Sequence, residues 1–318
     1  MKKTPVIFNH DAAIDEFMAA VLLTTMDEVE LQGIIVTNAD CIDSFAMEAS
    51  WKIQSFINHT RIPLALSQAR GWNPFPWLYR SDCIKENNLA VLWDYKPNPK
   101  WPPYPDGDKL LKKLLSRAVK KKRPVTLLVN CPLTTVVKVL KEHPHLKKGI
   151  AHMVWMAGAV YVPGNLDPTT IPPQVANPTA EWNVFWDPAA ADWVFQKTKF
   201  PITLFPLDVT NQAVITRAFM SSLQAQSGTY RYSRLALQSY SLVDKEAFYD
   251  MWDVVTTCYL TRPQFFDPPA KMKLAVVTEG FYQGTFYEDH EKGRSVDVIL
   301  NLKDADGFYS YVLEQFKR

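Results

Sequence analysis

Short hydrophobic runs alternate with longer, helix-like segments along the first two-thirds of the chain. Such runs predict buried strands, here at about 5–8, 30–37, 62–66, 125–129, 150–156 and 201–205. Helix-forming segments follow several of them, at about 17–23, 44–58, 109–119 and up to about 142. Strands and helices in alternation are typical of an α/β fold. We expect a doubly wound, mostly parallel central sheet flanked by helices.

The last third of the chain has a different pattern. Residues 232–260 are predicted to be mostly helical, residues 273–278 and 296–301 to be strands, and residues 305–317 to form a closing helix. Earlier in the chain, residues 67–106 hold much of the proline and tryptophan and show no sustained period. They are expected to form a long ordered loop at the active site, because loops of this length are usually functional. A chain of 318 residues is expected to form a single domain, residues 1–318.

Composition and charge exclude several classes of protein. Hydrophobic residues make up 47% and charged residues 21% of the chain, which is typical of a globular and not of a disordered protein. The formal net charge of +2 argues against a nucleic-acid-binding surface, and no hydrophobic run is long enough to span a membrane. The four cysteines show neither zinc nor disulfide spacing, and Asn9 interrupts the first hydrophobic run too early for a signal peptide. We therefore expect a cytoplasmic protein.

Three carboxylates, Asp11, Asp15 and Glu16, lie in the turn between the first predicted strand and its helix. Because they follow the carboxyl end of a parallel strand, they are expected at the crevice in which α/β folds bind ligands. Like charges this close repel one another unless a cation lies between them, and Ca²⁺ or Mg²⁺ prefers such oxygen ligands. The alternative is that the acidic residues only complement the dipole of the helix N-terminus.

Five segments spread over nearly the whole chain carry motifs. Residues 9–16 have the sequence N-H-D-A-A-I-D-E, residues 37–41 T-N-A-D-C, and residues 180–188 A-E-W-N-V-F-W-D-P. A W-D pair follows at Trp252 and Asp253, and glycines are spaced along residues 276–286. In this order the segments resemble the nucleoside hydrolase family of calcium-dependent N-ribohydrolases, whose first motif is D-x-D-x-x-x-D-D. They are most similar to its purine-specific inosine-adenosine-guanosine branch.

The resemblance implies hydrolysis of the N-glycosidic bond of purine ribonucleosides to ribose and free base. It implies that Asp11 is the general base. The implied Ca²⁺ ligands are Asp11, Glu16, the backbone carbonyl of Asn130, and Asp253. The implied ribose-binding residues are Asp15, Asn165, Glu181 and Asn183, whose carboxylates would also stabilise an oxocarbenium-like transition state. The expected partner is a small-molecule nucleoside, without nucleic acid or membrane, and the expected assembly is a homodimer or tetramer.

Activation of the leaving base differs between the branches of the family. Broad-specificity members carry a histidine near the late W-D pair, but none of the six histidines of this chain is in that region. The purine branch stacks the base between aromatic rings. The resemblance assigns Trp252 to one ring and Trp77 or Tyr79 to the other, with Asp40 contacting the purine. Loop packing is the alternative role for Trp77 and Tyr79.

The sugar-binding candidates also have structural explanations that the sequence leaves open. Glu181 could pair with a lysine, and Asn165 could make a turn after a glycine. Asn183 could bond local backbone ahead of a helix predicted to begin at Asp187 and Pro188.

Four substitutions depart from the family pattern. Glu16 replaces an aspartate and moves its carboxylate by about 1.5 Å, although a glutamate can still chelate Ca²⁺ through both oxygens. Asn9 and Asn38 replace aspartates. Ala12 replaces a glycine, which alters the turn if that position needs a positive φ.

Two hypotheses follow from these motifs and substitutions. The chain is a calcium-dependent purine nucleoside hydrolase, or it is a non-catalytic or weakly active relative that binds nucleosides or sugars. A phosphatase with its nucleophile on the first strand fits less well, because Asn9 breaks a D-x-D pair and no glycine-rich phosphate loop is present.

Overall fold

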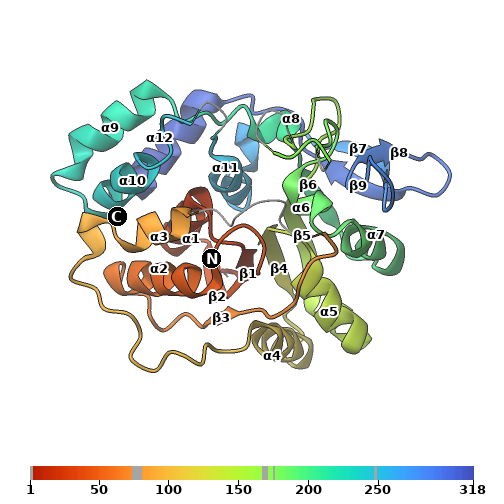
Figure 1. The fold of residues 1–318 in the computed structure, drawn as a ribbon, viewed down its shortest axis with the longest axis horizontal. Helices are drawn as coiled ribbons and strands as arrows, with labels where there is room; N and C mark the ends of the chain where they lie inside the picture. The colour runs from red at the N-terminus through yellow and green to blue at the C-terminus, as the bar shows by residue number, and fades with distance from the viewer. Residues whose placement is uncertain (1–2, 74–80, 167–170, 175, 247–248) are drawn as a thin grey trace.

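One sheet runs through the molecule. The computed structural model describes residues 3–73, 81–166, 171–174, 176–246 and 249–318. The strands of the described residues lie in the order β3-β2-β1-β4-β5-β6-β9-β7-β8 (Figure 1). They are β1 (Thr4–His10), β2 (Val29–Val36), β3 (Leu64–Leu66), β4 (Val125–Asn130), β5 (Ile150–Met156), β6 (Ile202–Phe205), β7 (Ala270–Val276), β8 (Phe286–Glu288) and β9 (Arg294–Val298).

Most strand pairs are parallel, as expected. Along the sheet from β3 to β2, β1, β4, β5, β6 and β9, each strand is parallel to the next. Strand β7 pairs antiparallel with both β9 and β8. The antiparallel strands form one end of the sheet, at the right of Figure 1. The doubly wound, mostly parallel sheet is therefore confirmed.

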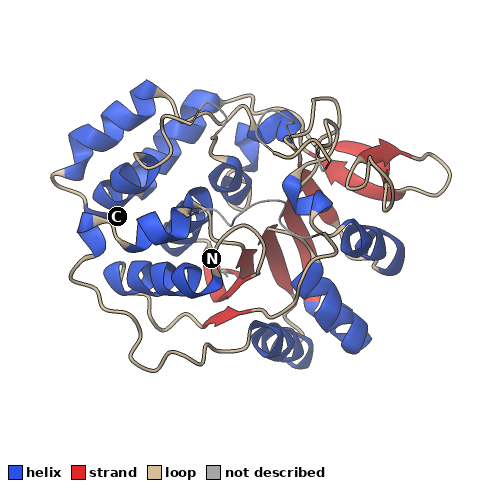
Figure 2. Cartoon of the chain, viewed as in Figure 1, coloured by secondary structure: helices blue, strands red, loops and turns tan. Residues whose placement is uncertain are grey.

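Helices cover both faces of this sheet (Figure 2). They are α1 (Ile14–Thr25), α2 (Asp43–Phe56), α3 (Asp82–Asn87), α4 (Gly107–Lys120), α5 (Thr134–Glu142), α6 (Trp182–Phe185), α7 (Pro188–Lys197), α8 (Leu207–Thr210), α9 (Arg217–Ser227), α10 (Arg231–Tyr240), α11 (Trp252–Cys258) and α12 (Ala305–Gln315). Short 3₁₀ helices lie at η1 (Ala90–Leu92), η2 (Pro144–Gly149) and η3 (Pro263–Phe265). One face packs against α1, α2 and α10 to α12, and the other against α4, α5 and α7.

Strand β1 contributes to the cores on both faces. Val6 and Phe8 pack into the cluster with α1 and α2, whereas Ile7, between them, packs into the cluster with α4 and α5. This follows because successive side chains of a strand point to opposite faces of the sheet. All three side chains are at most 1% exposed. A strand buried on both faces needs an uninterrupted hydrophobic run, and that is what the sequence has here.

The strand order reverses next to β1. From β1 the chain continues outward to β2 and β3, and it then returns to β4 on the other side of β1. Ligands of open α/β sheets bind at the carboxyl ends of the strands at such a reversal. In the register of the pair His10 lies opposite Asn130. Asp11 therefore leaves the sheet beside Asn130, at the reversal.

The described part of the segment 67–106 contains helical structure that the sequence did not predict. It contains α3 and η1, while residues 74–80, and with them Trp77 and Tyr79, lie outside the described residues. Helix α3 has six residues, too few for a helical period to stand out. A long-range contact holds it: the hydroxyl of Ser239 on α10 donates to Oε1 of Glu86 at 2.8 Å.

Other differences from the sequence-based expectation have local causes. The helix expected over 232–260 is divided into α10 and α11, and between them Asp250 bridges to Val214. Strand β8 was not predicted, because it has three residues and pairs only with β7. Helix α9 was not predicted either, since it buries only Phe219, Leu223 and Ser227 and so has a weak hydrophobic pattern.

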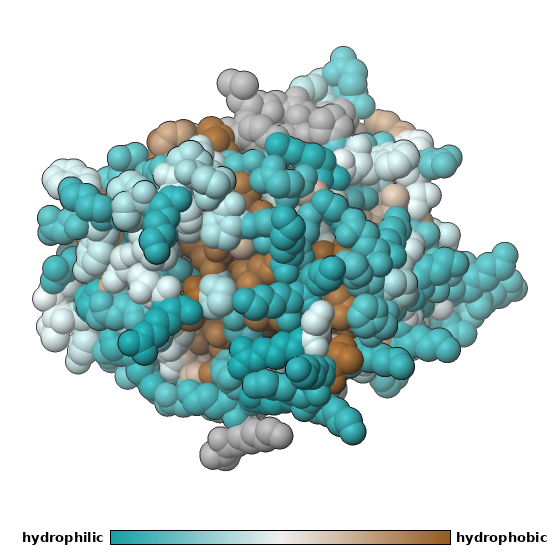
Figure 3. Space-filling view, turned by 90° about the horizontal axis from the view of Figure 1, so that it is seen from below, coloured by the Kyte–Doolittle hydropathy of each residue, from teal (hydrophilic) through white to brown (hydrophobic). Residues whose placement is uncertain are grey.

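The surface near α4 is polar. Seen from below, the molecule is largely hydrophilic, and hydrophobic side chains are visible mainly in hollows between polar ones (Figure 3). Helix α4 exposes Lys112 and Arg117 and buries Leu111 and Leu115. Within the described residues, no helix combines the length and hydrophobicity needed to cross a membrane.

Buried Glu86 predicts a pH-dependent loss of stability. Its side chain is 0% exposed, and burial raises the pKa of this carboxyl to about 8. In the unfolded chain a glutamate ionises near its ordinary pKa of about 4.3. The folded protein therefore holds the proton more tightly, and its stability falls as pH rises from about 4.5 to about 8, by up to about 5 kcal/mol.

The substitution Glu86→Gln removes this dependence. We expect the variant to have a higher Tm than the wild type at pH 9 and no such advantage at pH 5. Thermal unfolding at both pH values measures the difference, with exposed Glu291→Gln as the matched control. A gap between variant and wild type that does not change with pH would contradict the prediction.

Candidate active site

The chain leaves β1 through a tight turn that contains Asp11. The next residue, Ala12, has a left-handed backbone with a φ of 73°. Its N–H donates to Nδ1 of His10 at 3.2 Å. The positive φ that favours glycine is therefore present at a residue that carries a Cβ. Asp11 is 3% and Ala12 0% exposed, so protein encloses the turn.

Asp11, Glu16 and Asp253 form the acidic centre of the site. They come from the turn after β1, the first turn of α1 and the first turn of α11, and each is at most 6% exposed. Burial raises the pKa of Asp11 well above its usual range, and the carboxyl of Glu16 raises it further. Burial, followed by the charge of Glu16, raises the pKa of Asp253 as well. The three carboxyls therefore lie close enough to repel one another when ionised.

The donor set of this centre suits a hard cation. Among the described residues no group of three or more His, Cys, Asp or Glu side chains is arranged so that it could hold a metal ion. The available donors are nevertheless all oxygens, as Ca²⁺ and Mg²⁺ prefer. Oδ2 of Asp11 and the side-chain amide of neighbouring Asn130 are buried and make no hydrogen bond within the described chain. Buried polar atoms need a partner, and a cation with its waters supplies one.

Asp15 connects the acidic centre to α11. Its Oδ2 accepts the backbone N–H groups of Asp253 at 2.6 Å and Val254 at 2.9 Å. Its Oδ1 accepts the hydroxyl of Tyr240 at 2.6 Å. Asp15 thus satisfies two N–H groups at the N-terminus of α11, as a capping residue does. The side chain of Asp15 is 0% exposed, and the ribose contact expected of it stays a prediction.

Asn9 links the carboxyl ends of two strands to α5. Its amide donates to the carbonyl of Ile35 at 2.9 Å and to the hydroxyl of Thr37 at 2.7 Å. Thr37 in turn bonds Thr135 at 2.8 Å. An ionised aspartate, as in the family motif, has no hydrogen to donate to the Ile35 carbonyl. Compared with an aspartate, Asn9 therefore removes one negative charge near the site and adds a hydrogen bond between β1 and β2.

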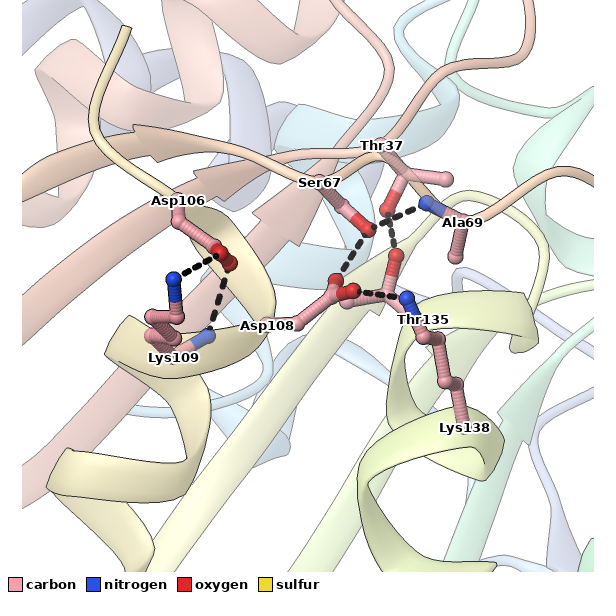
Figure 4. A network of polar contacts seen from close by, with 8 residues as sticks. All are labelled: Thr37, Ser67, Ala69, Asp106, Asp108, Lys109, Thr135 and Lys138. Atoms are coloured by element: carbon pink, nitrogen blue, oxygen red, sulfur yellow. Dashed lines mark hydrogen bonds and ion pairs between the residues drawn. The ribbon is translucent and has the colours of Figure 1, made fainter. Parts of the chain in front are cut away.

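A polar network anchors the start of the segment 67–106 (Figure 4). The hydroxyl of Ser67 donates to Asp108 of α4 at 2.5 Å, and it accepts the N–H of Ala69 at 3.1 Å. Lys138 of α5 forms an ion pair with the other oxygen of Asp108. The Thr37–Thr135 pair lies beside this network in Figure 4. The first residues of the segment are therefore held at the edge of the sheet that bears the acidic centre.

The three other sugar-binding candidates lie together. Glu181 accepts the backbone N–H of Gly158 at 2.8 Å and of Asn183 at 2.9 Å, so the alternative of a lysine partner does not describe it. The amide of Asn183 donates to the distant carbonyl of Met156 at 3.0 Å, not to local backbone. Oδ1 of Asn165 accepts the backbone N–H of Trp182, the residue after Glu181, at 3.3 Å. Burial raises the pKa of Glu181 to about 7.

Two of the base-binding candidates belong to the described chain. Asp40 follows β2 and is 7% exposed, and its charge contributes to the raised pKa of Asp11. Trp252 is half-buried at the start of α11, directly before Asp253. Its ring centroid lies 4.9 Å from that of Tyr249, and its Nε1 donates to Asn211 at 3.0 Å. Trp77 and Tyr79 lie outside the described residues.

Sequence reasoning missed several residues that support the site. Tyr240 and Tyr249 both bond Asp15, the second through the Asp15 N–H at 3.2 Å. Asp208 accepts the N–H groups of Val160 and Tyr161, each at 2.8 Å, and so holds the loop after β5. No local pattern marks Tyr240 or Tyr249. Only the strand-end position of Asp208, after β6, was a usable signal.

Comparison with known proteins gives this geometry a family. A model of the family "inosine-uridine preferring nucleoside hydrolase" matches residues 6–310. The chain belongs to the nucleoside hydrolase family. Membership confirms the expected resemblance and supports hydrolysis of the N-glycosidic bond of ribonucleosides as the class of reaction. The family is metal-dependent, in agreement with the oxygen donors of the acidic centre.

Relatives of this nucleoside hydrolase match over almost their whole length. Pyrimidine-specific ribonucleoside hydrolase RihA of Klebsiella pneumoniae (strain 342) is 26% identical, covering 98% of this chain and 97% of its own. Non-specific ribonucleoside hydrolase RihC of Escherichia coli (strain SE11) is 27% identical, with 98% of each chain covered. The crystal structure of an inosine-uridine preferring nucleoside hydrolase from Bacillus anthracis is 30% identical, with a TM-score of 0.85 over 99% of each chain.

A more distant structure shares the fold. The purine-preferring ribonucleoside hydrolase from Gardnerella vaginalis is 18% identical, with a TM-score of 0.78 over 99% of this chain and 98% of its own. The names of these relatives include both purine and pyrimidine preferences. The purine-specific branch is not confirmed by them, so the base preference of this nucleoside hydrolase has to be argued from its own residues.

Proposed function

We propose that this nucleoside hydrolase cleaves purine ribonucleosides to ribose and free base in a reaction that depends on Ca²⁺. The observation that carries the base preference is Trp252. This indole is half-buried next to Asp253 and is held by Tyr249 on its ring and Asn211 on its Nε1. An aromatic ring fixed beside the acidic centre offers a purine a surface on which to stack.

Ca²⁺ is the proposed cofactor because the ligands are all oxygens. Asp11, Glu16 and Asp253 would hold it, with the backbone carbonyl of Asn130 as a fourth protein ligand. Ca²⁺ accepts six to eight oxygens and tolerates bidentate carboxylates, which suits the longer side chain of Glu16 better than the strict octahedron of Mg²⁺ does. When bound, the cation supplies Lewis-acid activation of a water molecule and neutralises the buried charges.

Asp11 is the proposed general base. Its Oδ2 has no hydrogen-bond partner within the described chain and is available to accept a proton from the attacking water. Asn165, Glu181 and Asn183 would bind the ribose hydroxyls, together with Asp15. Positive charge develops on the sugar as the base leaves, and the carboxylates of Asp15 and Glu181 would stabilise it.

The base would leave without a histidine acid. None of the six histidines lies near α11 in the sequence, and the closest to the acidic centre, His10, stacks on Phe8 within the core. Stacking on Trp252 instead makes the purine easier to protonate from solvent, with Asp40 contacting the ring. Trp77 or Tyr79 is proposed for the opposite face. The expected homodimer or tetramer and the cytoplasmic location stay predictions.

Ribose release tests the proposal. We would assay inosine, adenosine, guanosine, uridine and cytidine with Ca²⁺ and again after EDTA treatment, and we expect Ca²⁺-dependent release from the purine nucleosides alone. Equal release from uridine would refute the purine preference and favour the broader activity named for the RihC relative. Release that survives EDTA would refute the metal requirement.

Inactivity would select the second hypothesis. No release from any nucleoside, with Ca²⁺ binding still measurable by calorimetry, would favour a nucleoside-binding relative that does not turn over. Glu16→Asp, which restores the family residue, is the matched variant. Activity gained by Glu16→Asp would identify the longer side chain as the cause of inactivity.

A further inference from the structure

The turn after β1 carries a conformation that its own residue disfavours. Ala12 has a φ of 73°, in the left-handed region where a Cβ is unfavourable. Its methyl group is 0% exposed and belongs to the hydrophobic core on the α1 side of the sheet. Packing favours alanine here, whereas the backbone favours glycine. A further interaction has to hold the turn in place.

His10 supplies that interaction. Its Nδ1 accepts the Ala12 N–H at 3.2 Å and so fixes the plane of the peptide between Asp11 and Ala12. The ring cannot turn away, because it stacks on Phe8 with centroids 4.8 Å apart and planes 7° apart. Phe17 meets it edge-on at 6.2 Å. The acceptor is therefore positioned before any ligand binds.

We propose that His10 is a positioning residue for Asp11: its Nδ1 holds Ala12 in the left-handed conformation and thereby sets the direction of the Asp11 carboxyl. The orientation of the Asp11–Ala12 peptide is described by the backbone angle ψ of Asp11. This angle sets how the Asp11 side chain, which leaves from Cα, is oriented relative to the rest of the turn. A carboxylate that serves as metal ligand and base tolerates only a small displacement. The catalytic meaning of this inference rests on the proposed function, whereas its structural part does not.

The hydrogen bond also specifies the chemical state of the ring. A nitrogen that accepts an N–H carries no proton, so the proton of the neutral imidazole lies on Nε2. Nε2 is buried and makes no hydrogen bond within the described chain. Oε1 of Gln54 is also buried and unpartnered in the described chain, and His10 and Gln54 line the same pocket. The two nitrogens of His10 therefore face different surroundings and can be tested separately.

Asparagine and glutamine separate the two nitrogens. His10→Asn keeps an acceptor at the δ position, as in an Asx-turn, and removes the ε position. His10→Gln keeps a polar group at the ε position and removes the δ acceptor. His10→Phe removes both while preserving a flat ring between Phe8 and Phe17. Each variant is also made with Ala12→Gly, which relieves the left-handed strain.

We expect His10→Phe and His10→Gln to lower both kcat and Ca²⁺ affinity by about 10- to 100-fold, the usual effect of losing a residue that orients a metal ligand. His10→Asn is expected to lose less than about fivefold. In the Ala12→Gly background the loss caused by His10→Phe should shrink to a few-fold, which is the coupling that a double-mutant cycle measures. Ca²⁺ affinity by calorimetry gives the same comparison without turnover.

Two results would overturn the inference. The first is a folded His10→Gln variant that matches His10→Asn, because the δ acceptor would then be irrelevant. The second is a His10→Phe loss that is the same with Ala12 and with glycine at position 12. Crystal structures of the variants add a readout independent of activity, with a changed φ at Ala12 expected in His10→Phe. If the wild type itself cleaves no nucleoside, the proposed function fails, and calorimetry and φ still decide the role of His10.

Discussion

Asp11→Ala is expected to abolish turnover, with kcat reduced by about 10³-fold or more, because the variant loses both a metal ligand and the general base. Ca²⁺ affinity should fall with it. Nucleoside hydrolysis and calorimetry measure the two effects, and exposed Asp94→Ala is the matched control. A variant that keeps full activity would contradict the proposed site.

Thermal unfolding provides a second test of Asp11, because the substitution should affect the Tm differently without and with Ca²⁺. Without metal, its carboxyl adds to the mutual repulsion of buried Glu16 and Asp253. Asp11→Asn should therefore have a higher Tm than the wild type in EDTA. In excess Ca²⁺ the wild type should gain far more, since a ligand stabilises only the state that binds it. Equal gains for the two proteins would show that Asp11 is not a ligand.

Trp252→Ala is expected to slow the cleavage of inosine by about 10- to 100-fold, the amount that a lost base–aromatic stack corresponds to. A substrate with a chemically activated leaving group, p-nitrophenyl riboside, should be affected much less, because its departure needs no help from the ring. Steady-state kinetics on both substrates measures the difference. Trp252→Phe keeps a stacking surface and is expected to retain most of the inosine activity.

Equal losses on both substrates would assign Trp252 a different role. Its Nε1 bonds Asn211, and its ring packs with Met156 and Leu207, so removing it could disturb α11 as a whole. Asn211→Ala is the control for that case, since it removes the hydrogen bond and leaves the ring. A loss in Asn211→Ala as large as in Trp252→Ala would make the contribution of Trp252 structural.

The elements of the fold were largely predictable because their signals are local. The uninterrupted hydrophobic run of β1 and the carboxylates after it are neighbours in sequence, and strand polarity alone brings them to the ligand-binding edge. Short or weakly patterned elements escaped prediction. α3 and β8 are stable because of what they pack against: Glu86 of α3 meets α10, and β8 exists only as a partner of β7.

In the candidate site, too, local features were predictable from the sequence and long-range contacts were not. Residue types and spacing identified Asp11 and Glu16 as candidates, and the resemblance to the family added Asp253. Their mutual proximity, expressed in the raised pKa values of Asp11 and Asp253, depends on bringing together turns separated by most of the chain.

By itself the sequence determined the class of fold, the family motifs and the chemical character of the site, since period, composition and motif spacing are properties of neighbouring residues. Only the tertiary structure decided how the carboxyls are held. Asp15 caps a helix 238 positions away, and Asn9 donates to β2 instead of carrying a charge. Ala12 adopts a glycine-like φ beside an acceptor on His10. These arrangements depend on contacts between distant segments, whose free energies arise only when the whole core is packed.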